Sequence, residues 1–439
     1  MNLIKKFFQP SLFISSLLLL IFTFYKSEIL HEGTIRGYYQ NFYILSAMLL
    51  FLSILWIFIN ENLKTYFLII FSSIIISVYI FEVYLTFHNN NVRDLKTKFK
   101  LYKEETGKEY DKSTSIEVLL KERKKDKNAT MVVPFTYFLN NDDNKIFALS
   151  GISNSKTIFC NQNGYFSTYK SDRFGFNNPD NEWDKKEIEY LLIGDSFVQG
   201  ACVNKPDDIG SVLRSLSKKS VLNLGYAAKG PLSEYATLRE YIRPNIKKII
   251  WFYFEGNDLD NLKAEMKSDI LIRYLKDINF SQNLVKKQSD IDLIGKKLVR
   301  QEEESLAKFK DDKKIEKIIN FIKIYRTRLL FSEETKVPSQ LNEILALTKK
   351  LSLENNSELY LVYLPNYYRY RFNLKKESSL KDLKKIAQDL EIPFIDIDKQ
   401  VFRKERDPLE LFPFKMHGHY NVLGYKKVMK AVYELTSND

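Results

Sequence analysis

Three short segments carry side chains whose types suit acyl chemistry. Ser196 follows an apolar run in "LLIGDSFVQG", Asn257 follows a second run in "KIIWFYFEGND", and His419 lies in "HGHYNVLGY" near the C-terminus. A serine beside a histidine base becomes a nucleophile, and an asparagine amide can donate to the oxyanion that forms when a serine attacks an ester. The three residues together favour ester hydrolysis or acyl transfer.

The small number of histidines limits which residue can act as the general base for Ser196. The chain has only 4, and His31 and His88 border apolar N-terminal stretches, so His417 or His419 is expected to serve Ser196. Structural alternatives stay open, since an Asp-Ser pair after a strand can also cap a helix. "HGH" lacks clear acidic partners, so neither a metal site nor a cofactor is expected.

The elements that must position these residues are short apolar runs separated by helix-length segments. The runs are "EYLLIG", "SVLNLG", "KIIWFYFEG", "ELYLVYLP" and "IPFIDID". Such alternation is typical of an α/β domain with a doubly wound parallel sheet, here predicted over 187–439. Ligands of such sheets bind at the carboxyl ends of the strands, where Ser196 and Asn257 stand. A charged insertion at about 259–340 is predicted to be an amphipathic helical cover, with a lid or partner surface as the alternative.

Over roughly residues 171–432 the sequence resembles the bacterial SGNH hydrolases, the GDSL esterase and acyltransferase superfamily. The segments that carry the resemblance are "SDRFGFNNP", "GDSFVQG", "LNLGYAAKGPL", "EGND" and "HGHYNVLGY". The resemblance implies a flavodoxin-like doubly wound sheet, Ser196 as nucleophile and His419 as general base. It also implies an oxyanion hole made of the Ser196 and Ala228 N–H groups and the Asn257 amide. Ala228 departs from the family's glycine, with Gly225 and Gly230 as neighbouring alternatives.

A second departure concerns the acid that orients the histidine. The family places an Asp two or three residues before it, but Met416 and His417 occupy those positions here. Either a backbone carbonyl orients His419 in a Ser–His dyad, or another acid such as Asp407 or Glu410 reaches the site. Asp195 and Asp258 are further supporting candidates, since they adjoin Ser196 and Asn257. A catalytically inactive glycan-binding or assembly module is the remaining alternative.

Three apolar stretches precede residue 88 and are predicted to be transmembrane helices of an anchor over 1–88. They run from Phe7 to Tyr25, from Phe42 to Ile59 and from Tyr66 to Phe81, the last continuing past Glu82 to Phe87. Lys5 and Lys6 favour an inside N-terminus, which places the α/β domain outside the cytoplasm, although basic residues from Arg93 to Lys103 oppose this. The sequence thus predicts a multi-pass protein of the cell membrane with a periplasmic domain.

The segment 89–186 is predicted to be a linker or accessory region of mixed structure: a charged helix to about Lys127, then short strands and loops. Its Cys160 and the later Cys202 form either a disulfide in an oxidising compartment or two free buried thiols. The net charge is +12, but lysines alternate with acids as on solvated helix faces, so nucleic-acid binding is not expected.

The resemblance to members associated with surface polysaccharides implies a substrate class. We expect a membrane-anchored esterase that removes O-acyl groups, acetyl first among them, from a surface polysaccharide or glycolipid. An O-acetyltransferase that uses the same serine, with a membrane partner as acyl donor, is the alternative.

Overall fold

The computed structural model describes residues 2–30, 33, 36–88, 95–139, 146–306, 319, 321–324, 327–328, 337–371 and 377–437. His31 and much of the later part of the predicted insertion lie outside these ranges. The chain divides into two compact units. Residues 1–90 and 313–332 form the first, and residues 91–312 and 333–439 form the second.

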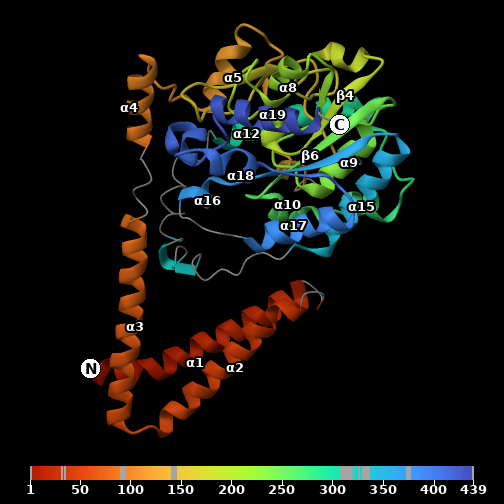
Figure 1. Cartoon of the computed structure of the whole chain (residues 1–439). Coiled ribbons are helices and arrows are strands. Elements are labelled where there is room, and N and C mark those ends of the chain that lie inside the picture. The colour runs from red at the N-terminus through yellow and green to blue at the C-terminus, as the bar shows by residue number, and fades with distance from the viewer. Residues whose placement is uncertain are drawn as a thin grey trace. The chain divides into compact units, whose positions relative to one another are not determined.

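Among its described residues, the first unit has three helices that are long and apolar enough to cross a membrane, over Phe7–Leu30, Tyr39–Phe58 and Glu61–Thr86. They belong to α1 (Asn2–Phe24) with a π-helical extension (Tyr25–Leu30), α2 (Arg36–Phe58) and α3 (Glu61–His88). Helices α1 and α2 pack along each other (Figure 1). Thr327 from the insertion donates its N–H and hydroxyl to Glu82 of α3, at 2.8 and 2.7 Å. Helices of sufficient length and apolar character thus lie where the sequence predicts the three spans.

The second unit is built on a five-stranded parallel sheet with the order β5-β4-β6-β7-β8. The strands are β4 (Ile188–Ile193), β5 (Val221–Asn223), β6 (Ile246–Phe254), β7 (Glu358–Leu364) and β8 (Phe394–Asp396). In chain order this is 2-1-3-4-5, the flavodoxin-like arrangement. The strand order reverses between β4 and β6, so the loops after these two strands diverge and leave a crevice between them. The predicted doubly wound fold is confirmed.

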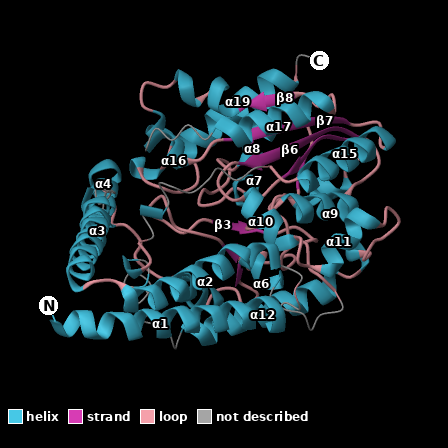
Figure 2. Cartoon of the chain, turned by 90° about the horizontal axis from the view of Figure 1, so that it is seen from below, coloured by secondary structure: helices cyan, strands magenta, loops and turns pink. Residues whose placement is uncertain are grey.

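Strand side chains alternate between two hydrophobic clusters, one on each face of the sheet. On β4, Leu191 and Ile193 belong to one cluster and Tyr190 and Leu192 to the other. Helices α9 (Pro231–Tyr241), α15 (Ser339–Glu354) and α17 (Glu377–Asp389) pack into the first cluster, and α8 (Ile209–Ser217) and α19 (Val422–Thr436) into the second. Figure 2 shows the strands between these helices. Both faces are covered, which explains why the strands read as continuous apolar runs.

The remaining helices of the sheet domain lie in its connections. They are α7 (Ser196–Gln199), α10 (Asp258–Glu265), α11 (Asp269–Lys276), α12 (Gln288–Leu306), α16 (Tyr367–Arg371) and α18 (Ile397–Gln400). Of these, α10, α11 and α12 belong to the predicted insertion. Helix α12 is amphipathic as expected, with Ile291, Leu298 and Val299 buried and Leu293 exposed.

The accessory segment packs on the α9 side of the sheet and shares its hydrophobic cluster. It contains α4 (Leu95–Thr106), α5 (Ser115–Arg123), β1 (Thr130–Met131), α6 (Thr136–Leu139), β2 (Lys156–Ile158) and β3 (Thr168–Lys170). Its strands form a small separate sheet in which β1 and β2 are parallel and β2 and β3 antiparallel. The N–H of Phe135 donates to the carbonyl of Ala227 at 2.9 Å, which joins this segment to the loop after β5.

Candidate active site

Ser196 lies at the first position of α7, directly beyond the end of β4. Asp195 caps the helix by accepting the N–H of Phe197 at 2.8 Å. Gly194 makes the sharp turn from strand to helix: a Cβ there would meet the Val198 side chain at 2.4 Å. The strand end and the tight turn together bring the Ser196 hydroxyl to the sheet edge, where the sequence places it.

His419 meets Ser196 from the loop before α19. Its Nε2 lies 2.8 Å from the Ser196 Oγ. The ring of Phe197 packs against the imidazole with centroids 4.6 Å apart. His417, the other candidate base, stacks instead on Tyr368, with centroids 4.8 Å apart and planes at 20°. Of the two histidines considered from the sequence, His419 is the one in contact with the serine.

The other side of the imidazole faces Gln162 from the accessory segment. Gln162 Oε1 accepts the backbone N–H of His419 at 2.7 Å and lies 3.1 Å from Nδ1. A backbone N–H can only donate, so the side-chain atom that it meets is the amide oxygen. The same oxygen then accepts from Nδ1–H, which leaves Nε2 as the acceptor for the serine hydroxyl. Gln162 therefore fixes the tautomer that a general base needs.

Gln162 corrects the expectation about the orienting group. Asp407 and Glu410 do not orient His419: their carboxylates bind Lys415 Nζ at 2.7 and 3.0 Å. Sequence reasoning missed Gln162 because it lies 257 residues before His419, in a segment outside the family motifs. The one available signal was its position two residues after Cys160.

A disulfide holds the Gln162 loop next to the nucleophile. Cys160 and Cys202 are bonded, with Cα atoms 4.9 Å apart, so of the two alternatives the disulfide is the one found. Asn163 Nδ2 also donates to the Cys202 carbonyl at 2.8 Å. Cys202 lies shortly after α7, so these bonds tie Gln162 to the turn that follows Ser196. Gly418 lets Gln162 approach, because a Cβ at residue 418 would lie 2.6 Å from its Oε1.

Burial determines the charge of the base. Desolvation by the surrounding protein lowers the pKa of His419 to about 4, and His417 adds a smaller effect in the same direction. The imidazole is therefore neutral at pH 7 and free to accept a proton.

The oxyanion donors expected besides the Ser196 N–H are the Ala228 N–H and the Asn257 amide. Both residues line the same cavity as Ser196. Ala228 has a φ of 63°, in the left-handed region that favours glycine. The neighbouring Ala227 N–H donates to Gln199 Oε1 at 2.7 Å, which fixes this loop to the end of α7. Gly225 and Gly230, the alternatives, do not line the cavity.

Asn257 caps α10 at the end of β6 and lines the cavity with Ala228. Its side chain hydrogen-bonds Asp195. Its Oδ1 is buried and has no hydrogen-bond partner within the part of the chain that the structure describes. An amide held in this way presents its NH₂ group to the space around Ser196 and the Asp195 carboxylate.

The two supporting acids are buried beneath the site. Asp195 has a pKa raised to about 6, chiefly by burial. Asp258 accepts the N–H of Phe254 at 2.8 Å. Burial, reinforced by Glu234 and Asp195, raises its pKa well above the usual range. Neither acid is bonded to His419, so both support the loops that carry Ser196 and Asn257.

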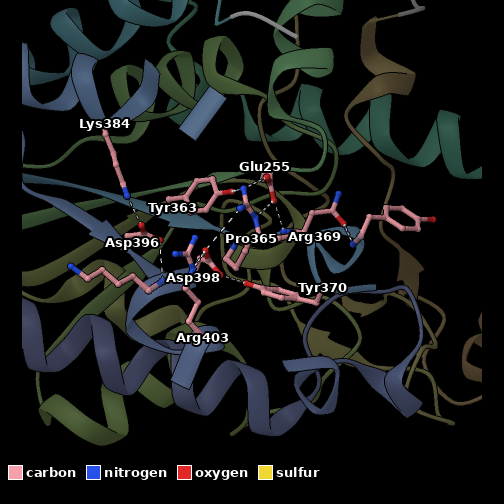
Figure 3. Close-up of polar contacts among 12 residues, drawn as sticks. Glu255, Tyr363, Pro365, Arg369, Tyr370, Lys384, Asp396, Asp398 and Arg403 are labelled. Carbon is pink, nitrogen blue, oxygen red and sulfur yellow. Dashed lines mark hydrogen bonds and ion pairs between the residues drawn. The ribbon is translucent and has the colours of Figure 1, made fainter. Parts of the chain in front are cut away.

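A buried ionic network anchors the loop that carries Asn257 (Figure 3). Glu255 binds the Arg369 guanidinium and also accepts the N–H of Asn366 at 2.9 Å. Arg369 donates to the Tyr363 hydroxyl at 2.7 Å and lies 3.9 Å from Asp398. Since Glu255 and Arg369 are both less than a tenth exposed, loss of one partner would strand a buried charge. The network therefore keeps the ends of β6 and β7 in fixed relation.

A cavity of about 610 Å³ opens over Ser196 and His419. The sheet loops provide its floor, and the accessory segment and α12 contribute walls. Tyr137 and Tyr368 line it and are exposed to solvent. The arrangement therefore brings a serine, a histidine in contact with it and groups that can donate hydrogen bonds into a space that admits a small molecule.

Comparisons with known proteins give similarity in fold. No protein-family model matches the sequence, and no curated protein matches it. A lipolytic protein of the G-D-S-L family from Desulfitobacterium hafniense is 14% identical over 57% of this chain and 99% of its own, with a TM-score of 0.33. An acetyl xylan esterase is 11% identical over 57% and 100%, with a TM-score of 0.33. The SGNH-hydrolase family esterase AlinE4 is 11% identical over 58% and 97%, with a TM-score of 0.27.

Identities and TM-scores this low say nothing about activity. Conclusions about activity therefore rest on the geometry of the site. The second unit is an α/β domain with a flavodoxin-like parallel sheet, similar in fold to SGNH/GDSL lipolytic proteins and esterases.

Proposed function

We propose that this chain is a membrane-anchored serine esterase of the SGNH/GDSL kind, which cleaves O-acyl esters through an acyl-enzyme. The observation that carries the proposal is the 2.8 Å contact between Ser196 Oγ and His419 Nε2. The Nδ1 of the same imidazole faces an acceptor. A structural histidine needs no such pairing with a serine at a strand end.

The mechanism follows from these positions. His419 Nε2 takes the proton of Ser196 Oγ as that oxygen attacks the ester carbonyl, and Gln162 keeps the imidazole oriented. The N–H groups of Ser196 and Ala228 and the Asn257 amide stabilise the oxyanion. His419 then gives the proton to the departing alcohol oxygen. Water, activated by the same base, attacks the acyl-enzyme and restores the serine.

The substrate class and location are part of the proposal. We place the sheet domain outside the cytoplasm of a multi-pass membrane protein. The Cys160–Cys202 disulfide supports this placement, because disulfides persist in oxidising compartments. A domain tethered there reaches the acylated surface polysaccharides and glycolipids that the family resemblance implies. A sugar hydroxyl that replaces water as the acceptor, with a membrane partner as acyl donor, would make the same site an acyltransferase.

The test is fluorophosphonate labelling of the full chain in lipid nanodiscs. We expect labelling of the wild type, none in Ser196→Ala, and a rate at least 100-fold lower in His419→Ala, because the base no longer activates the serine. His417→Ala is the matched control: this histidine has no bond to Ser196 and only a small effect on the pKa of His419, so labelling should fall far less than in His419→Ala. A folded wild type that is never labelled would overturn the proposal in favour of a glycan-binding module.

A further inference from the structure

One wall of the active-site cavity is apolar, and we propose that it binds an acyl chain several carbons long, so that the preferred acyl group is larger than acetyl. This inference rests on the proposed esterase function and specifies its substrate. The wall is formed by Met131, Val132, Val133 and Pro134 of the accessory segment with Leu298 and Val299 of α12.

The chemistry of the reaction decides which part of an ester meets this wall. The base must reach the leaving oxygen, so the alcohol part lies toward His419. The carbonyl oxygen lies on the oxyanion donors, and the acyl chain takes the remaining direction. On this side of the cavity Gln162 contacts His419, and Tyr368 stacks on His417, two residues before it. These suit an alcohol that carries hydroxyl groups, such as a sugar.

The apolar wall begins next to the oxyanion loop. Val133 and Pro134 directly precede Phe135, whose N–H binds the carbonyl of Ala227 at 2.9 Å. Ala227 adjoins Ala228, the proposed oxyanion donor. This hydrogen bond therefore joins the end of the segment 131–134 to the residue just before Ala228, whose N–H would bind the carbonyl oxygen of the ester.

Polar bonds around its edge hold the wall in place. Tyr137 donates to Glu302 of α12 at 2.9 Å, and Arg123 pairs with Glu303 at 2.5 Å. Asp292 near the start of α12 accepts the N–H and hydroxyl of Ser153 at 2.9 and 2.7 Å. Helix α12 is thus fixed to the accessory segment, and the wall is formed before a substrate arrives.

The cavity is far larger than an acetyl group. Its volume is about 610 Å³, within the range of about 300 to 1,000 Å³ that is typical of small-molecule sites. An acetyl methyl would fill a small fraction of that space. Each further methylene buried against the wall should raise kcat/KM by about 4-fold, until the chain reaches the end of the cavity.

The experiment measures kcat/KM of the full chain in nanodiscs on p-nitrophenyl acetate, butyrate, hexanoate and octanoate. We expect kcat/KM to rise by about 10-fold or more from acetate to butyrate, since two methylenes are added. Leu298→Ala lengthens the cavity and should move the best substrate to a longer chain. Val133→Phe shortens it and should move the best substrate to a shorter one. Ile291→Ala is the matched control, because Ile291 is a buried residue of α12 outside the cavity lining.

A wild type labelled at Ser196 by fluorophosphonate that prefers acetate would overturn the inference and leave the proposed function intact. A chain-length profile that is the same in Leu298→Ala, Val133→Phe and Ile291→Ala would also overturn it. Absence of both labelling and hydrolysis in folded protein would overturn the proposed function, and this inference with it.

Discussion

Replacing the neutral Gln162 by glutamate tests whether this residue orients the base. In Gln162→Glu a carboxylate oxygen takes the place of Oε1, which lies 3.1 Å from His419 Nδ1. The carboxylate would still accept the backbone N–H of His419, so the tautomer is kept. The change adds one negative charge beside the imidazole and alters little else.

The magnitude follows from the distance. At about 3 Å and an effective dielectric constant of about 20, a full ion pair is worth about 5 kcal/mol, an upper limit that exposure to solvent reduces. Measured shifts for such pairs are about 1 to 3 pKa units. The pKa of His419, about 4 in the wild type, should therefore rise to between about 5 and 7.

The assay is the pH profile of kcat/KM on a p-nitrophenyl ester. His419 must be neutral to act, so activity is present above its pKa and is lost as the pH falls through it. In the wild type the acid limb should lie near pH 4, and in Gln162→Glu it should lie about 1 to 3 units higher. The rate above that limb should rise by about 10- to 100-fold, because the new charge stabilises the imidazolium that forms in the transition state.

Two variants control for general disruption. Gln162→Met keeps the length of the side chain but removes the acceptor, so activity should fall by about 100-fold in protein that is still folded at the assay temperature, with no rescue at high pH. Gly418→Ala places a methyl group 2.6 Å from the present position of Oε1 and should lower activity through Gln162 alone. An acid limb in Gln162→Glu identical to that of the wild type would refute the assignment of Gln162 as the positioning residue.

Three further outcomes are expected. Asn257→Ala should lower kcat by about 100-fold with little change in KM, because the amide is needed only once the oxyanion forms. A rise in KM as large as the fall in kcat would contradict this role. Ala228→Gly should stabilise the fold by about 1 kcal/mol in thermal unfolding, since a φ of 63° strains a residue with a Cβ. Loss of the disulfide, which spans 42 residues, through Cys160→Ser with Cys202→Ser should cost about 4 kcal/mol. It should also lower kcat/KM at temperatures where the protein stays folded. An unchanged kcat/KM there would show that the disulfide is not needed to hold Gln162 next to His419.

The sheet domain could be predicted because each of its strands is marked by a pattern within a few consecutive residues. Strands buried on both faces must be continuous apolar runs, and "EYLLIG" and "KIIWFYFEG" are easily recognised as such. Ser196 and Asn257 come shortly after these two strands in the sequence. Their position at one edge of the sheet can therefore be predicted without knowing how side chains pack. The three apolar helices before residue 88 are equally evident from length and composition.

The orienting group could not be predicted in this way. Gln162 reaches His419 through a fold of the accessory segment that depends on a small sheet, a disulfide and the bond from Asn163 to Cys202. None of these has a periodic pattern. Asp407 and Glu410 were plausible by nearness in sequence, but both carboxylates pair with Lys415 instead of His419.

The origin of Gln162 also bears on truncation and on how related chains are classified. Gln162 lies ahead of the first strand of the parallel sheet, so a boundary drawn at residue 187 would separate the serine and the histidine from the side chain that orients the imidazole. A shortened protein intended for enzymology has to begin before α5 and keep both cysteines. A chain that lacks an acid just before its histidine is therefore not inactive on that ground alone, since an amide from an upstream segment can occupy the same side of the ring.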